Sequence, residues 1–272
     1  MNHLTAIIFI ALLGLELPVS LNGQINHSFR ITLNTGLKFY NWSEYDKNST
    51  QNLDESGTLF LVGLSATYNF ITGSNIYTKS DIYFYTGSVD YDGYLQNDYG
   101  TNTPYKTETG YKGVELLLNF GYNFNITHNF ILAPELGFEY EYWNRDLGKG
   151  DKHGYKETYN VFFMDFGFNG NLRVVPKVLI FMKFLGEIPL SISESVDLSP
   201  WEGSGSSVID LTPGSNVGIN FESGVIAYNI SLSLYIDYLL FSPSKLNRNI
   251  FQPESDRSIF GVKLGYTFYI KI

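Results

Sequence analysis

Two short stretches of the chain hold residue types that could activate a water molecule. Asp90 and Asp92 are separated by one residue in SVDYDGYLQ, residues 88–96, and Asp151 and His153 are separated in the same way further along. Alternate side chains of an extended chain point to the same side, so each pair would present its two groups together. An aspartate beside a histidine is the pair that orients a general base. These four residues are therefore the candidate catalytic site.

The Asp90–Asp92 pair also has two simpler interpretations. Asn97, Asp98 and Gly100 follow it, and this composition is typical of ordinary turns. Two carboxylates could also bind a divalent cation through their oxygens, although the spacing of an EF-hand loop is absent. The sequence lacks a Gly-rich phosphate loop, a Ser nucleophile motif and any Cys. We therefore predict no metal site and no cofactor.

The segments that must position these residues alternate between apolar and polar side chains. From Phe260 to Ile272 the even-numbered residues are all apolar, whereas the odd-numbered ones are small or polar. A period of two indicates a β-strand with one apolar face. Similar patterns predict ten strands, at about residues 28–42, 57–70, 76–87, 111–124, 129–143, 157–172, 177–190, 214–227, 230–241 and 258–272.

The connectors between these strands alternate between short and long. The short ones are ITGSN, NITH, VVP and YN, and the long ones include SEYDKNSTQNLDES, residues 88–110 and NRDLGKGDKHGY. Short turns at one end and long loops at the other are typical of bacterial outer-membrane barrels. No internal stretch approaches the roughly 20 apolar residues of a membrane helix. We therefore predict an all-β fold, a ten-stranded antiparallel transmembrane β-barrel with meander order, short periplasmic turns and long extracellular loops.

A secreted soluble sandwich or a lipocalin-like barrel is the alternative fold. It would leave apolar side chains exposed on one face of nearly every strand, which favours the membrane barrel. Residues 1–23 resemble a secretory signal peptide with an apolar core from Leu4 to Leu15, so we expect residues 24–272 to form a single barrel domain. The formal net charge of -9 argues against a nucleic-acid partner.

Charged side chains recur on the strand face opposite the apolar one. The predicted lumen network consists of Arg30, Lys38, Glu115, Glu135, Glu139, Glu141, Asp165, Arg173, Lys183 and Glu187. A barrel of about ten strands is too narrow for an aqueous channel once such side chains cross it. Unpaired charges in a confined lumen would be costly, so we predict a charge-paired plug. A narrow polar conduit remains the alternative.

Two motifs resemble those of known outer-membrane proteins. The segment from Lys263 to Ile270 resembles the terminal strand signal by which Gram-negative barrels are recognised for assembly. The stretch Val89-Asp90-Tyr91-Asp92 resembles the Val-Asp-x-Asp element of the omptins, which are ten-stranded outer-membrane endopeptidases. In the omptins an aspartate pair faces an Asp-x-His pair across the barrel mouth and activates water. The resemblance implies these roles for Asp90 with Asp92 and for Asp151 with His153.

The omptin pattern is matched in part. Gly93 stands where the family has Trp, and Gly154 separates the His from Tyr155. The two pairs also fall on the second and third outer loops, whereas the family carries them on the second and fourth. We therefore expect an outer-membrane barrel with an occluded lumen and a role in surface interaction, adhesion or envelope integrity. An omptin-like endopeptidase that cleaves near basic residues is the alternative. The expected partners are outer-membrane lipid and lipopolysaccharide, with cationic peptides or proteins as candidates because most of the outer loops are acidic.

Overall fold

Ten long β-strands make up most of the structure. The computed structural model describes residues 29–46, 48–70, 75–96, 102–148, 154–199, 208–248 and 250–270. The long strands are β1 (Phe29–Tyr45), β2 (Gln51–Asn69), β3 (Ile76–Gln96), β4 (Asn102–Tyr122), β6 (Phe130–Leu147), β7 (Tyr155–Val175), β8 (Val178–Asp197), β11 (Gly218–Ala227), β12 (Ile230–Ser242) and β13 (Glu254–Ile270). Three short strands accompany them: β5 (Phe124–Asn125), β9 (Val208–Leu211) and β10 (Gly214–Ser215). Within these ranges, no helix is long and apolar enough to cross a membrane.

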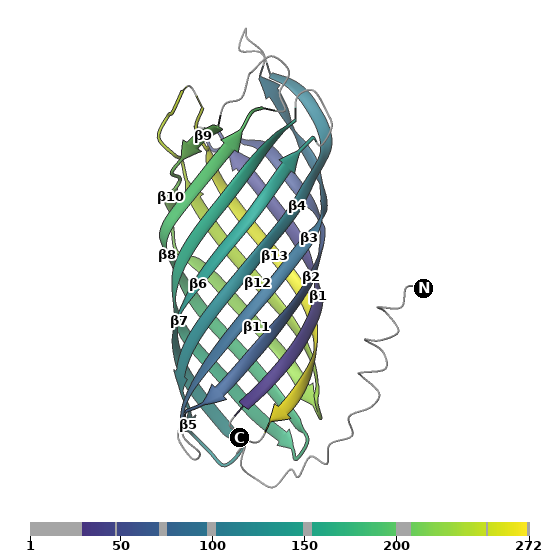
Figure 1. The fold of residues 1–272 in the computed structure, drawn as a ribbon, viewed down its shortest axis with the longest axis vertical. Coiled ribbons are helices and arrows are strands. Elements are labelled where there is room, and N and C mark those ends of the chain that lie inside the picture. The colour runs from purple at the N-terminus through teal and green to yellow at the C-terminus, as the bar shows by residue number, and fades with distance from the viewer. Residues whose placement is uncertain are drawn as a thin grey trace, which may run out of the picture.

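The ten long strands close into a barrel (Figure 1). Each long strand pairs antiparallel with the long strands before and after it in the chain. The first and last strands also pair, from Phe29 opposite Ile270 to Tyr45 opposite Glu254. Closure leaves no unpaired sheet edge, which a structure in the hydrocarbon core of a bilayer requires. The predicted ten-stranded antiparallel meander is confirmed.

An apolar belt covers the outer face of the barrel. Its residues alternate along the strands with inward-facing ones, as the period of two predicts. Representative members that are exposed at the outer surface are Leu33, Leu37, Phe39, Phe60, Val62, Leu64, Leu116, Leu118, Phe120, Leu232, Leu234 and Ile236. A continuous apolar belt is the outer surface expected of a barrel that faces lipid.

Several strands continue beyond this belt as a polar wall. On β3 the exposed outward residues change from Phe84 to Thr86, Ser88, Asp90 and Asp92. The pairing of β3 with β4 extends to Gln96 opposite Asn102, so the stretch that the sequence predicts as a long loop is mostly a hairpin. The period of two continues there, but with polar residues outside and apolar residues inside. Hydrogen bonding of the backbone and packing of the inner face therefore lengthen the strands above the lipid.

A β-bulge in β8 changes which residues face the lumen. Leu190 is skipped in the register between β7 and β8. Before the bulge the odd-numbered Lys183 and Glu187 are buried inside the barrel, and after it the even-numbered Ile192 and Glu194 are buried. One extra residue in one strand shifts the alternation by one position. The bulge thus brings Glu194 into the upper part of the barrel interior.

Tyrosine rings lie against inward-facing glycines of neighbouring strands. A Cβ atom at Gly63, Gly113, Gly121 or Gly261 would collide with the ring of Tyr83, Tyr85, Tyr77 or Tyr235, respectively. Aromatic side chains that cover glycines support curved, closed sheets. Only glycine permits these close approaches, so the rings can pack along the inner wall.

Candidate functional site

The extracellular half of the lumen is filled by a set of residues that we call the upper cluster. Its members come from six strands and lie above the lipid belt: Trp42, Glu44, Glu55, Tyr111, Trp143, Arg145, Glu157, Tyr159 and Phe241. Except for Glu44, each has at most 5% of its surface exposed. Residues from opposite sides of the barrel therefore meet across the lumen.

Arg145 is the charged centre of the upper cluster. Its Nη1 donates to Glu157 Oε2 at 2.6 Å and to Glu44 Oε1 at 3.2 Å, and its Nε donates to Glu55 Oε2 at 3.0 Å. Glu55 also accepts hydrogen bonds from Thr109 and Tyr111. One guanidinium thus joins β1, β2, β6 and β7. Hydrogen bonds between a charged guanidinium and carboxylates are stronger than those between neutral groups.

Aromatic rings enclose this ionic centre. Trp143 stacks on Tyr159 with ring centroids 4.6 Å apart, and Trp42 contacts Phe241 at 5.2 Å. The Arg145 guanidinium lies 5.6 Å from the Trp42 ring. Aromatic packing and cation–π contacts stabilise a charge that water cannot reach. The division into an apolar outer face and a charged inner face thus does not hold above the lipid belt, where the interior is largely aromatic.

A second arginine lies below the upper cluster. Arg257 on β13 donates to Glu141 at 2.6 Å and to Asp237 at 3.0 Å, and its guanidinium lies 5.2 Å from the Trp143 ring. Tyr85 also donates to Glu141, at 3.1 Å. This layer connects β3, β6, β12 and β13 across the lumen.

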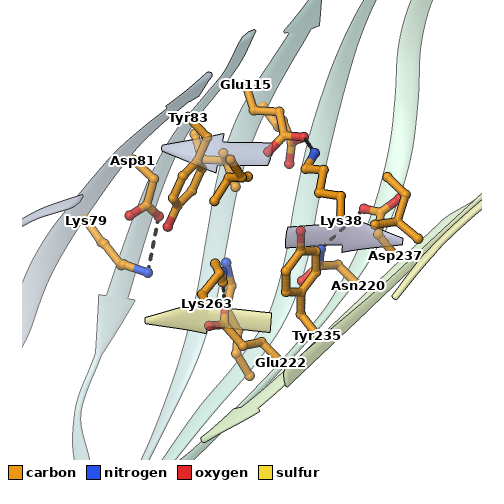
Figure 2. A pocket seen from close by; sticks show the side chains of 15 residues that line it. Lys38, Lys79, Asp81, Tyr83, Glu115, Asn220, Glu222, Tyr235, Asp237 and Lys263 are labelled. Carbon is orange, nitrogen blue, oxygen red and sulfur yellow. Dashed lines mark hydrogen bonds and ion pairs between the residues drawn. The ribbon is translucent and has the colours of Figure 1, made fainter. Parts of the chain in front are cut away.

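A polar cavity of about 50 Å³ lies lower in the lumen. Figure 2 shows three ion pairs that line it: Lys38–Glu115, Lys79–Asp81 and Lys263–Glu222. Glu139 and Lys183 line it as well. A polar cavity of this size has room for a few water molecules. The lower lumen is therefore polar and lined by ion pairs, in contrast to the aromatic interior above it.

Burial and neighbouring charges together shift the pKa values of ionisable groups above the lipid belt. Burial opposes the charge of Arg145, but Glu157 and Glu55 outweigh it and hold the arginine pKa well above its usual value. Burial raises the pKa of Glu157, and Arg145 offsets this only in part. For Glu194, burial and then the charges of Glu157 and Glu44 raise the pKa to about 9. At neutral pH Glu194 therefore carries a proton.

The predicted catalytic residues are only partly within the described chain. Asp90 and Asp92 lie near the extracellular end of β3, exposed on its outer face, between the inward-facing Val89 and Tyr91. Asp92 forms an exposed ion pair with Lys106 of β4 at 2.5 Å. Asp151 and His153 lie outside the described residues, so the quartet stays a prediction. A catalytic quartet would need His153 to reach this outer face.

The predicted lumen residues all lie on inward-facing positions. Lys38, Glu135, Glu139, Glu141, Asp165, Lys183 and Glu187 are buried, whereas Arg30, Glu115 and Arg173 are partly buried. The predicted lumen network lacks Glu55, Arg145, Glu157 and Arg257, which are all buried inside the barrel. Arg145 was expected in the third outer loop, but it lies in β6. Glu157 is the first residue of the predicted strand 157–172, and continuing the alternation past the ends of the other predicted strands would have placed Glu55, Arg145 and Arg257 inside.

Comparisons with known proteins identify the fold. No family model matches the chain, and no curated protein matches it. The outer-membrane protease OmpT from Escherichia coli is similar over 92% of this chain and 100% of its own, with 12% identity and a TM-score of 0.53. A major outer membrane protein from Thermus thermophilus is similar over 89% of this chain and 100% of its own, with 12% identity and a TM-score of 0.45.

The translocator domain of the autotransporter NalP from Neisseria meningitidis is similar over 91% of each chain, with 7% identity and a TM-score of 0.44. At these identities the similarity shows the fold alone. The closed barrel and its outward apolar belt agree with that fold. The chain is therefore an outer-membrane β-barrel protein of the cell outer membrane.

Proposed function

We propose that this protein is a sealed barrel whose extracellular wall and loops serve surface interaction or envelope integrity, without conducting solutes. The observation that carries the proposal is the upper cluster, because aromatic and ion-paired side chains from six strands meet across the lumen. A transport path would have to break the Arg145 ion pairs and separate the stacked rings. Below this seal, the Arg257 layer crosses the lumen a second time.

Conductance in planar bilayers tests the seal. The refolded protein is expected to show no single-channel steps, because the buried side chains leave no continuous aqueous path. A matched variant with Trp42→Ala and Phe241→Ala removes two fully buried rings of the seal and should show steps if a path then opens. Regular, discrete steps from the wild-type protein would refute the proposed sealed lumen.

The charge of the extracellular wall supports a cationic partner. Along β2, β3 and β13, Asp54, Asp90, Asp92, Glu254 and Asp256 lie on the outward face above the lipid belt. A wall with one dominant sign of charge steers oppositely charged molecules towards it. Basic peptides or proteins are therefore the class of partner that this wall would attract.

An omptin-like endopeptidase is the second candidate. The observation that favours it is the position of the motif residues Asp90 and Asp92 near the extracellular end of β3. In this function a dibasic peptide would be cleaved, whereas a surface-interaction barrel would bind it without cleavage.

One assay separates the two functions. The refolded barrel is incubated with lipopolysaccharide and a fluorogenic dibasic peptide, and both binding and cleavage are measured. We expect salt-sensitive binding that Asp90→Asn with Asp92→Asn weakens, and no cleavage. Cleavage that is lost in both His153→Ala and Asp90→Asn would instead support the endopeptidase.

A further inference from the structure

The connection between β12 and β13 contacts a part of β8 that β11 does not cover. β11 begins at Gly218, which pairs with Glu187, and β8 continues beyond this pair. From residue 188 to residue 193, β8 has no strand partner on the β11 side within the described part of the chain. We call residues 243–248 and 250–253 of the connection the strap.

The strap is attached to the barrel at two places. Ile250 packs against a small apolar cluster of β8 and β9, which consists of Val196, Ile209 and Leu211. Asn247 Nδ2 donates to the backbone oxygen of Asp210 beside this cluster, at 2.9 Å. At the second place Gln252, which is buried, accepts a hydrogen bond at its Oε1 from the Tyr159 hydroxyl at 3.1 Å. The bond between Gln252 and Tyr159 ties the strap to the upper cluster.

The hydroxyl of Tyr159 has more acceptors around it than it can serve. Tyr159 of β7 is the register partner of Glu194 of β8, and both side chains are at most 1% exposed. The hydroxyl lies 3.1 Å from Gln252 Oε1 and 3.4 Å from Glu157 Oε2. It also reaches the Glu194 carboxyl, where its hydrogen bond favours the ionised form. A tyrosine hydroxyl has one proton, so it donates to one of these three groups at a time.

The proton on Glu194 decides which group receives this hydrogen bond. With its proton, Glu194 can donate to the Tyr159 oxygen, and the tyrosine proton stays available for Gln252. Glu157 competes less, because its Oε2 already accepts from Arg145 at 2.6 Å. Without its proton, Glu194 is a charged acceptor, which binds a donor more strongly than a neutral amide does. Gln252 then loses its donor, and a buried acceptor without a donor is costly.

The surroundings of Glu194 oppose its negative charge. Among the described residues, the ionisable groups that act on it are Glu44 of β1, Arg145 of β6, and Glu157 and Tyr159 of β7. Its register partner on β9 is the apolar Leu211, and the charged side chains of the strap are exposed to solvent. Burial, followed by Glu157 and Glu44, raises the pKa of Glu194 to about 9. Burial also holds the pKa of Tyr159 well above its usual value, so the tyrosine keeps its proton in this range.

We propose that Glu194, Tyr159 and Gln252 form a proton-dependent latch that holds the strap against the barrel. The latch is closed while Glu194 carries its proton, and it opens more often as that proton is lost. Opening exposes the side of the upper cluster that contains Tyr159. The latch goes beyond the proposed surface role, because it concerns the movement of the strap and does not depend on what the outer wall binds.

Thiol labelling measures how often the strap opens. The chain has no cysteine, so a single one can be introduced. Ile250→Cys places a thiol where the strap packs against β8 and β9, and Leu246→Cys places one at a strap position that is 66% exposed. The refolded barrel is treated with iodoacetamide in detergent micelles between about pH 6 and pH 10. Dividing the rate at position 250 by the rate at position 246 corrects for the ionisation of the thiol itself.

The rate ratio is expected to be low at pH 6 and to rise with pH. One proton links the latch to the pH, so the rise should be at most about tenfold per pH unit and should level off above about pH 9. Glu194→Gln cannot ionise and should keep the ratio low at every pH. Tyr159→Phe keeps the ring but removes the hydroxyl, so it should raise the ratio at neutral pH and flatten its pH dependence.

Tyr45→Phe is the matched control. It removes a hydroxyl that bonds to Asp256 away from the latch and should leave the wild-type profile unchanged. The proposal fails if the wild-type ratio does not change with pH, or if Glu194→Gln follows the wild type. It also fails if Tyr159→Phe behaves like Tyr45→Phe. Labelling does not depend on conductance, so these outcomes are separate from the test of the sealed lumen.

Discussion

Replacing Arg145 with methionine is expected to lower the free energy of unfolding by about 3–5 kcal/mol, because it leaves buried carboxylates without their partner. Glu55 and Glu157 are at most 5% exposed, and both lose an ion pair with the arginine. Methionine keeps much of the packing volume but no charge. The measurement is urea unfolding of the barrel in phospholipid vesicles, followed by tryptophan fluorescence.

The control for this substitution is an exposed ion pair on the same barrel. Lys106→Met removes the partner of Asp92, but both side chains lie largely in solvent, with 75% and 58% of their surfaces exposed. Exposed pairs contribute little to stability, so the unfolding midpoint should stay close to that of the wild type. Equal effects of Arg145→Met and Lys106→Met would show that Arg145 does not organise the upper cluster.

Replacing Glu194 with glutamine is expected to flatten the pH dependence of stability between about pH 4.5 and pH 9. The folded pKa of Glu194 is raised from 4.5 to about 9, chiefly by burial, so the folded state holds a proton that the unfolded state releases. The stabilisation from this proton is fully present below the unfolded pKa. It is lost as the pH rises through the folded pKa, so the wild-type free energy of unfolding falls across this window.

The size and sign of the Glu194 effect can be measured by urea unfolding at several pH values. One proton accounts for a slope of at most about 1.4 kcal/mol per pH unit. The wild type and Glu194→Gln should have similar stability near pH 4.5, and the variant should become the more stable one as the pH approaches 9. Glu157, whose pKa is also raised, leaves a smaller residual slope in the variant. If the stabilities of the two proteins changed with pH in parallel, the raised pKa of Glu194 would not be the source of the pH dependence.

Residues of the candidate site could be predicted where the local period of two decides which side chains face inward. They could not be predicted where the pairing register between strands decides which side chains meet. Lys38 and Glu115 are predicted to face inward by alternation alone, and the structure joins them in an ion pair. Arg145 and Glu55 lie beyond the predicted strand ends, where the outward residues become polar. The apolar signal of a lipid-facing strand disappears there, although the strand continues. Their contact links positions 90 residues apart, which no local pattern reveals.

The sequence by itself determined the class of fold, the number of long strands and which residues of the strands face the lower lumen. These features follow from a period of two and from the alternation of connector lengths, both of which are local properties of the chain. Only the tertiary structure decided that the strands rise above the lipid, that the bulge at Leu190 turns Glu194 inward, and that Arg145 pairs with carboxylates from three other strands. The reason is that barrel closure sets the stagger between strands, and the stagger decides which inward side chains meet across the interior.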